Sequence, residues 1–263
     1  MLRVRDLTIR FHDQREAEEA VHGISFDMAP GEILGLVGES GSGKTVTALS
    51  IAGLLRRRAA TVGGQISFCG QDLLTLEPRQ MRTIQGKRIG MVFQEPMTSL
   101  NPLMKVGKQV EEVLRVHTHQ TPRERRESAL DALAAVELSD PERVYGQYPH
   151  ELSGGMRQRA ILAAAILLGP ELLICDEPTT ALDVTTQAQI LALLQKMNRD
   201  IGVGLLFISH DLRLVRRFCR RAIVMQDGHI VEQGDVETLF ERPQAAYTKQ
   251  LLQSLPGRGR RHE

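Results

Sequence analysis

The pattern of apolar and polar positions divides the chain into strand-rich ends and a helical middle. Residues 2–9 alternate apolar and polar side chains, which predicts an edge strand. Short apolar runs predict further strands at Ile24–Met28, Glu32–Val37, Gln65–Cys69, Leu172–Cys175, Gly204–Ser209, Ala222–Met225 and Ile230–Glu232. Helical patterns separate the later runs, which is typical of a parallel sheet covered by helices.

Helical signals dominate from about residue 95 to residue 168. An earlier helix is predicted at Thr45–Leu55, directly after a glycine-rich loop. Thr121–Glu124 is a capping box with proline at the first helical position. The apolar stripe of the helix behind it is predicted to be Ala129, Leu130, Leu133, Ala134 and Leu138. The apolar run Ala160–Leu168, which Gly169 and Pro170 follow, predicts a buried helix. It is the longest apolar run and is far shorter than the ~18 residues that cross a bilayer.

Composition narrows the function classes. A length of 263 residues suggests one large α/β domain or one domain with an inserted subdomain. Lys plus Arg (33) nearly equals Asp plus Glu (32), and this balance does not favour a nucleic-acid ligand. Residues 1–20 lack a signal-peptide core, so we expect a cytosolic protein whose membrane role comes through a partner. Cys69, Cys175 and Cys219 show no CxxC spacing, which argues against a zinc site, and Cys175 is interpreted as a core residue.

One glycine-rich run carries the strongest chemical signal. It matches G-x-x-x-x-G-K-[ST] in full, as Gly38-Glu39-Ser40-Gly41-Ser42-Gly43-Lys44-Thr45. A strand precedes it and a helix follows, so backbone N–H groups and the helix dipole can converge on phosphate oxygens. Lys44 would add a charge for the β- and γ-phosphates, and Thr45 a hydroxyl for Mg²⁺.

Two carboxylates follow a buried strand. Asp176 and Glu177 come directly after Leu172–Cys175, and parallel strands present their carboxyl ends to the ligand crevice. Asp176 would join the Mg²⁺ shell, and Glu177 would act as general base on the attacking water. Such a string could by itself end a strand with surface acids. Together with the phosphate loop it predicts a P-loop NTPase.

A glycine pair after residue 150 narrows the class of P-loop NTPase. Leu152-Ser153-Gly154-Gly155-Met156-Arg157-Gln158 resembles the ABC signature, in which Ser153 caps a helix and the glycines leave backbone amides bare. An ordinary Ser-Gly-Gly turn is the alternative. The resemblance to the ABC ATPase family continues with Gln94 as the Q-loop glutamine, Ala181-Leu182-Asp183 as the D-loop and His210 as the switch histidine. Phe11 stands where the family stacks an aromatic ring on adenine, although it could equally be a core residue.

This resemblance implies a fold and its division. The fold would be an ABC-type P-loop α/β fold with a mostly parallel core sheet, an N-terminal antiparallel β subdomain and an inserted α-helical subdomain. An ATPase domain would cover residues 1–254. Its catalytic core would comprise residues 1–94 and 169–254, its helical subdomain residues 95–168, and a short basic tail residues 255–263.

The resemblance also implies the site residues. Catalytic roles fall on Lys44, Gln94, Glu177 and His210, and Mg²⁺ ligation on Thr45, Gln94 and Asp176. The implied ATP contacts are Phe11, Gly38, Glu39, Ser40, Gly41, Ser42, Gly43, Lys44, Thr45, Val46, Gln94, Ser153, Gly154, Gly155 and Asp176. Because each motif occurs once, two chains would pair head to tail, with the loop of one facing the signature of the other.

Further strings resemble the importers of the peptide/nickel family. These are Gln94–Pro102, Tyr148–Glu151, Asp176–Val184 and the C-terminal pattern Pro243, Tyr247-Thr248 and Leu251-Leu252. The resemblance implies that residues 95–105 receive a coupling helix from one of two membrane permease subunits. The chain ends soon after Leu252, without a cysteine-bearing extension, which favours the shorter nickel or metal-chelate relatives over an iron–sulfur variant.

The partners and alternatives follow from the same resemblance. We expect a second ATPase subunit (a paralogue or a second copy), the permeases, an extracytoplasmic binding protein acting indirectly, and a place on the cytoplasmic face of the membrane. The alternatives are an exporter ATPase, a soluble ABC ATPase and a non-hydrolysing regulatory subunit. The sequence leaves the cargo open among peptides, nickel, metal chelates, opines and glutathione.

Overall fold

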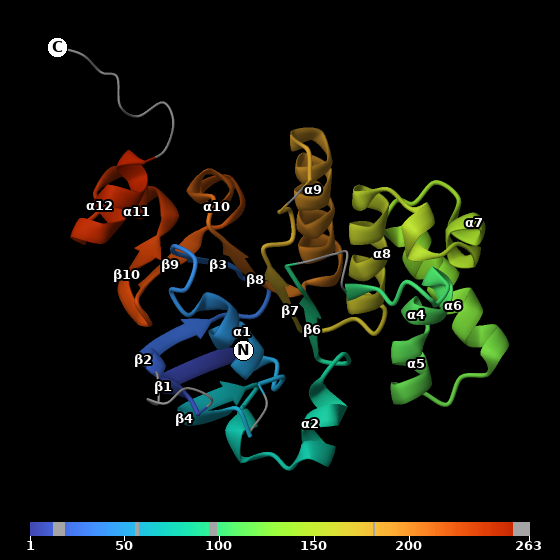
Figure 1. Cartoon of the computed structure of the whole chain (residues 1–263), viewed down its shortest axis with the longest axis horizontal. Helices are drawn as coiled ribbons and strands as arrows, with labels where there is room; N and C mark the ends of the chain where they lie inside the picture. The colour runs from blue at the N-terminus through green and yellow to red at the C-terminus, as the bar shows by residue number, and fades with distance from the viewer. Residues whose placement is uncertain (13–18, 56–57, 95–98, 181, 255–263) are drawn as a thin grey trace. The chain divides into compact units, whose positions relative to one another are not determined.

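A computed structural model describes residues 1–12, 19–55, 58–94, 99–180 and 182–254 (Figure 1). The chain divides into two compact units, a first unit of Met1–Glu77 with Gly204–Glu263 and a second unit of Pro78–Val203. In the described ranges, no helix has both the length and the apolar character needed to span a bilayer. Parts of three predicted strings lie outside the described residues, namely residues 95–98, residue 181 and the tail from residue 255.

The N-terminal part of the first unit is an antiparallel sheet. Its strand order is β2–β1–β4–β5, with β1 at Leu2–Phe11, β2 at Glu19–Met28, β4 at Ala60–Phe68 and β5 at Gln71–Asp72. The prediction of an edge strand at residues 2–9 is wrong, because β1 pairs with β2 on one side and β4 on the other. The alternation of apolar and polar side chains shows only that one face of a strand is buried. A central strand of an antiparallel sheet can have the same pattern as an edge strand.

A bulge explains a second difference from prediction. The register of β1 against β4 shifts after Arg5, where Asp6 has φ 48° and Gly64 has φ 87°. A Cβ atom on Gly64 would lie 2.3 Å from the Asp6 carbonyl oxygen, so only glycine fits there. The strand predicted to start at Gln65 therefore starts at Ala60, since the glycine pair marks a bulge inside the strand.

The second sheet of the first unit is mostly parallel. Its strands are β3 at Ile33–Val37, β8 at Gly204–Ser209, β9 at Arg221–Gln226 and β10 at His229–Asp235. β3 runs parallel to both β8 and β9, and β10 closes the sheet antiparallel to β9. The helices of this unit are α1 (Lys44–Ile51), α10 (Leu212–Phe218), α11 (Val236–Glu241), α12 (Ala246–Gln253) and the 3-10 helix η1 (Leu73–Thr75). α1 stops four residues before the predicted Leu55, because Gly53 adopts φ 65° directly after the cap.

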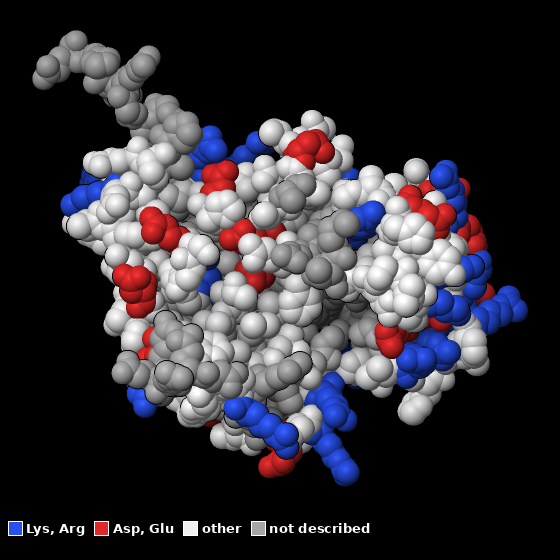
Figure 2. Space-filling view, in the orientation of Figure 1, with Lys and Arg blue, Asp and Glu red and all other residues white. Residues whose placement is uncertain are grey.

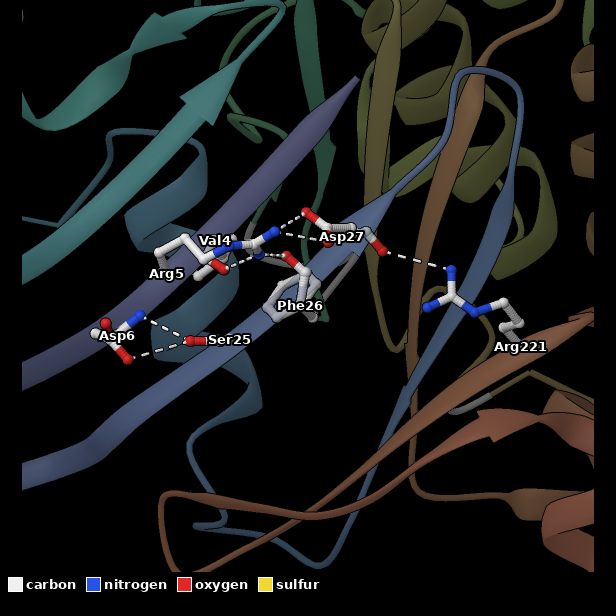
Figure 3. A network of polar contacts seen from close by, with 7 residues as sticks. All are labelled: Val4, Arg5, Asp6, Ser25, Phe26, Asp27 and Arg221. Carbon is white, nitrogen blue, oxygen red and sulfur yellow. Dashed lines mark hydrogen bonds and ion pairs between the residues drawn. The ribbon is translucent and has the colours of Figure 1, made fainter.

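Polar side chains join the strands of the first unit (Figure 3). The Arg5 guanidinium donates to both carboxylate oxygens of Asp27, at 2.8 and 2.7 Å. The Ser25 hydroxyl accepts the Asp6 N–H at 2.8 Å and so satisfies the backbone at the bulge. Arg221 at the start of β9 donates to Glu32 at 2.7 Å, which ties β9 to the entry of β3.

The second unit combines one strand pair with most of the helices. β6 (Ile89–Val92) and β7 (Leu172–Asp176) are parallel. The helices are α2 (Pro78–Ile84), α4 (Val106–Val110), α5 (Glu112–His117), α6 (Pro122–Ala135), α7 (Pro141–Gly146), the 3-10 helix η2 (Pro149–Glu151), α8 (Gly154–Ile166) and α9 (Val184–Ile201). α6 packs against both α7 and α8. The predicted helical texture of the middle of the chain is thus present.

The predicted capping box starts α6. The Thr121 hydroxyl accepts the Glu124 N–H at 3.3 Å, and the Glu124 carboxylate accepts the Thr121 N–H at 2.6 Å. The predicted stripe is wrong at Ala134, which is exposed, because the buried face of α6 runs through Ala129, Ala132 and Leu133. Figure 2 shows basic and acidic side chains interspersed over α6 and α7, and Arg123 pairs with Glu127 at 3.0 Å.

Candidate functional site

The phosphate loop lies between β3 and α1 of the first unit. α1 begins at Lys44, and its cap residue Gly43 has the left-handed φ of 96°. No side chain caps this helix, and its first turn, all of it described, carries no acidic residue. The first N–H groups of α1 and the positive end of its dipole are therefore placed to meet an external anion.

Glycine is required in the loop for steric reasons. A Cβ atom on Gly38 would lie 2.2 Å from the Met225 carbonyl oxygen on β9, and one on Gly43 would lie 2.9 Å from the Ala20 carbonyl oxygen. Gly41 differs, because it has φ 83° and only open space within 4 Å of a Cβ position. The loop is thus pressed against its own unit at Gly38 and Gly43 and open at Gly41.

Lys44 folds back over this loop. Its ammonium donates to the Gly38 carbonyl at 2.8 Å, the Glu39 carbonyl at 2.6 Å and the Ser42 hydroxyl at 3.1 Å. Lys44 is only 5% exposed, so these acceptors are needed to keep its charge in a buried position. The sequence predicts a point charge at the loop, and the structure fixes that charge within the loop itself.

His210 shares the edge from which the loop emerges. β3 and β8 are parallel with Val37 opposite Ser209, so the loop and His210 leave the sheet at the same end. His210 is exposed, and the Asp211 side chain behind it caps α10 by accepting the Arg213 N–H at 2.8 Å. Phe11 is the half-buried last residue of β1.

The carboxylates lie at the matching end of the strand pair in the second unit. Val92 is opposite Cys175, so Gln94 and Glu177 leave β6 and β7 on the same side. The Gln94 amide donates to Glu177 Oε2 at 3.4 Å, and the Thr180 hydroxyl donates to the same oxygen at 2.8 Å. The structure therefore brings the predicted base and the Q-loop glutamine together, and it adds Thr180, for which the sequence alone predicts no role.

Glu177 also has an unusual backbone. Its φ is 47°, a left-handed conformation that costs free energy in a residue other than glycine. Asp176 before it is 2% exposed at the end of the strand. Burial, followed by the nearby charge of Asp176, raises the pKa of Cys175, so this cysteine stays a thiol in the core as expected.

The signature string starts α8. The Ser153 hydroxyl accepts the Met156 N–H at 3.3 Å, which makes Ser153 the predicted cap. Gly155 has a packing role as well, because a Cβ atom there would lie 2.6 Å from Thr186 Cγ2 on α9. Asp183 holds Thr186 in place by accepting its N–H at 3.0 Å and its hydroxyl at 2.6 Å.

Each half of the predicted site lies in its own unit. The first unit holds the loop residues, Phe11 and His210, and the second holds Gln94, the two carboxylates and the signature. The sequence does not predict one further contact of the loop: Tyr247 on α12 accepts the Glu39 N–H at 3.1 Å. From the sequence alone, Tyr247 stands out only as one residue of the C-terminal pattern shared with the peptide/nickel importers.

Comparisons with known proteins point to one family. The family model described as ABC transporter matches residues 21–180. A probable peptide ABC transporter ATP-binding protein of Sinorhizobium fredii is 51% identical over 99% of this chain and 78% of its own length. A peptidoglycan transport ATP-binding protein of Agrobacterium fabrum is also 51% identical, over 97% of this chain and 47% of its own length.

Solved structures show the same fold. A dimeric ATP-binding cassette in a post-hydrolysis state, bound to ADP and phosphate, superposes with a TM-score of 0.80 and 29% identity. That superposition covers 90% of this chain and 99% of the cassette. A component of a Clostridium perfringens ABC transporter complex gives 0.77 and 26% identity, covering 92% and 91% of the two chains. The predicted mostly parallel core, antiparallel N-terminal sheet and helical region are confirmed.

Proposed function

Because this chain belongs to the ABC transporter family as an ATP-binding, ATP-hydrolysing subunit, we propose that it powers an importer of the peptide/nickel class. The structural observation that supports ATP binding is the Lys44 ammonium, held by two carbonyl oxygens and the Ser42 hydroxyl at the base of a loop that is open at Gly41. The three acceptors hold the ammonium at the loop, and a bound triphosphate would take the place of one or more of them.

ATP binding is assigned to the loop and its neighbours. Residues 38–46 supply the amides, the ammonium and the Thr45 hydroxyl, and Phe11 supplies a ring for the base. Bound Mg²⁺ would neutralise charge on the β- and γ-phosphates. Thr45, Gln94 and Asp176 fit this ion, since each offers an oxygen and Mg²⁺ binds few protein ligands beside phosphate and water.

Hydrolysis is assigned to the second unit with His210. Glu177 would take the proton of the attacking water, while Gln94 and Thr180 fix its Oε2 by two hydrogen bonds. His210, exposed at the end of β8, would contact the γ-phosphate.

The signature implies a partner. The N-terminal end of α8, at Ser153–Gly155, would be a second anion-binding site. We propose that it binds the ATP held by another ATPase subunit in a head-to-tail dimer. One of the similar cassettes is itself dimeric. Since a ligand shifts a conformational equilibrium only through its differential affinity, signature contacts to the γ-phosphate would hold the dimer closed until hydrolysis. The second subunit is either a copy or a paralogue.

The remaining parts of the proposal concern the membrane and the cargo. Residues 95–168 would form the helical subdomain, and residues 95–105 would contact permease subunits from the cytoplasmic face of the membrane. An extracytoplasmic binding protein would deliver the cargo to those permeases. The relatives from Sinorhizobium and Agrobacterium are named for peptide and peptidoglycan transport, so we propose peptide-containing cargo in preference to nickel.

Uptake in cells that carry the complete transporter tests this function. Lys44→Ala should abolish uptake of a labelled peptide. Lys196→Ala is the matched control, because the Lys196 side chain is 50% exposed on α9 and pairs with the exposed Glu137 at 3.7 Å. Uptake of radioactive nickel in the same cells distinguishes the two cargo classes. Peptide uptake that persists in the Lys44→Ala cells would overturn the proposal.

A further inference from the structure

The C-terminal helix of the first unit contacts the phosphate loop through one hydroxyl group. Tyr247 lies on α12 and accepts the Glu39 N–H at 3.1 Å, although 208 positions separate the two residues in the chain. Tyr247 is only 8% exposed, so the phenol is held by packing as well as by this hydrogen bond. Burial is the main cause that raises the pKa of Tyr247, which keeps the hydroxyl protonated near neutral pH.

The bonded amide belongs to a peptide group that also holds Lys44. The peptide between Gly38 and Glu39 has its N–H on Tyr247 and its carbonyl oxygen on the Lys44 ammonium, 2.8 Å away. Hydrogen bonds at both ends of one peptide group fix its plane and polarise each other. The same peptide cannot move toward β9, because Gly38 is already pressed against Met225.

α12 is itself anchored to the sheet. Its cap residue Ala245 provides no side-chain hydrogen bond, and the Glu232 carboxylate on β10 instead holds the backbone of the two residues that precede the helix. One oxygen of Glu232 accepts the Gln244 N–H at 2.8 Å, and the other accepts the Ala245 N–H at 3.1 Å. α11 and α12 both contact β10, at the red end of the colour range in Figure 1. The position of the Tyr247 hydroxyl is therefore set by β10 through Glu232.

We propose that Tyr247 is a positioning residue of the phosphate loop, which fixes the Gly38–Glu39 peptide and through it the Lys44 ammonium that receives ATP. This inference rests on the proposed function for its consequence in catalysis. The hydrogen bond between the loop peptide and the Tyr247 side chain is also present in the nucleotide-free chain. In the absence of the hydroxyl, the peptide can rotate and Lys44 loses part of its fixed orientation.

The first test is amide hydrogen exchange in the full-length, nucleotide-free chain. Tyr247→Phe keeps the ring and removes the hydroxyl, so exchange at the Glu39 amide should become about fivefold faster, equivalent to about 1 kcal/mol. Tyr145→Phe is the matched control, because Tyr145 is 7% exposed and donates its own hydrogen bond, to Glu111 in the second unit. Exchange at Glu39 that is unchanged in Tyr247→Phe, or equally faster in both variants, would overturn the proposal.

ATPase kinetics give the second readout. Weaker positioning of Lys44 lowers ground-state binding, so Tyr247→Phe should raise KM for ATP about fivefold and leave kcat within about twofold. Glu232→Gln, which weakens the anchor of α12 without touching Tyr247, should raise Glu39 exchange in the same direction. If Tyr247→Phe does not fold, faster exchange in Glu232→Gln supports the inference and unchanged exchange refutes it. A wild-type chain that hydrolyses no ATP together with its ATPase partner would refute the proposed function, while the exchange result would still decide the role of Tyr247.

Discussion

Replacement of Gly155 by alanine should destabilise the second unit through a single contact. The new Cβ atom would lie 2.6 Å from Thr186 Cγ2, well inside van der Waals contact. Thr186 cannot easily turn away, because Asp183 accepts both its N–H and its hydroxyl, at 3.0 and 2.6 Å. The clash must therefore separate the start of α8 from the start of α9 or break the Asp183 cap.

The magnitude follows from two opposing effects. Inserting an atom into a tightly packed contact costs about 1–3 kcal/mol of unfolding free energy. Replacing glycine by alanine in a helix returns about 0.5–1 kcal/mol, because the unfolded chain loses conformational freedom. We expect Gly155→Ala to lower the unfolding free energy by about 1–2 kcal/mol as the net of these two effects.

A second substitution separates these effects. Thr186→Ser removes Cγ2 and keeps the hydroxyl that Asp183 accepts. In that background Gly155→Ala should be neutral or slightly stabilising, which gives a coupling energy of about 1–3 kcal/mol in a double-mutant cycle. Because the chain contains no tryptophan, urea unfolding is best followed by far-UV circular dichroism. Additive effects of the two substitutions would refute the steric reasoning.

Two further predictions concern stability. The pKa of Glu232 lies below its ordinary value of 4.5. Burial is the largest single effect and raises this pKa, but the N–H bonds from Gln244 and Ala245, the Thr248 side chain and the charge of Lys249 together outweigh it. Because the pKa is lower in the folded state, the ionised Glu232 carboxylate contributes stability that is complete above about pH 4.5 and is lost as the pH falls through the folded-state pKa. The difference in urea midpoint between wild type and Glu232→Gln should therefore shrink in that acid range. A midpoint difference independent of pH would contradict this. Gly107→Ala should destabilise the second unit by about 1–3 kcal/mol or more, because the new Cβ atom would lie 1.9 Å from the Tyr145 ring. An unchanged urea midpoint would show that α4 and α7 do not pack as closely as this distance implies.

The chemistry of this chain is predictable wherever it is local in the sequence. The phosphate loop is one continuous run between a strand and a helix, so its glycine conformations and the Lys44 position follow from the motif and its flanks. The capping box of α6 is similarly local, and both hydrogen bonds of the Thr121–Glu124 pair follow from the sequence pattern. Apolar runs predict the strands correctly in kind, although several boundaries differ.

Features that depend on long-range packing are not predictable in this way. Alternation in residues 2–9 does not reveal that β1 has neighbours on both sides, and the pair Gly63-Gly64 does not reveal a bulge until Asp6 is placed opposite. Tyr247 meets Glu39 only because α12 is anchored to β10. The roles given to His210, Phe11 and the signature glycines toward ATP remain predictions of the family resemblance.

The most direct test of the account is phosphate release from Mg·ATP by the full-length chain with its ATPase partner, compared between wild type and Glu177→Gln. We predict that the wild type hydrolyses ATP and that the variant is slower by about 10²–10⁴-fold, the contribution of a general base. The variant should still bind ATP and accumulate as the ATP-bound dimer. A variant that releases phosphate at the wild-type rate would contradict the assignment of Glu177, and a wild type that neither binds nor cleaves ATP would contradict the account as a whole.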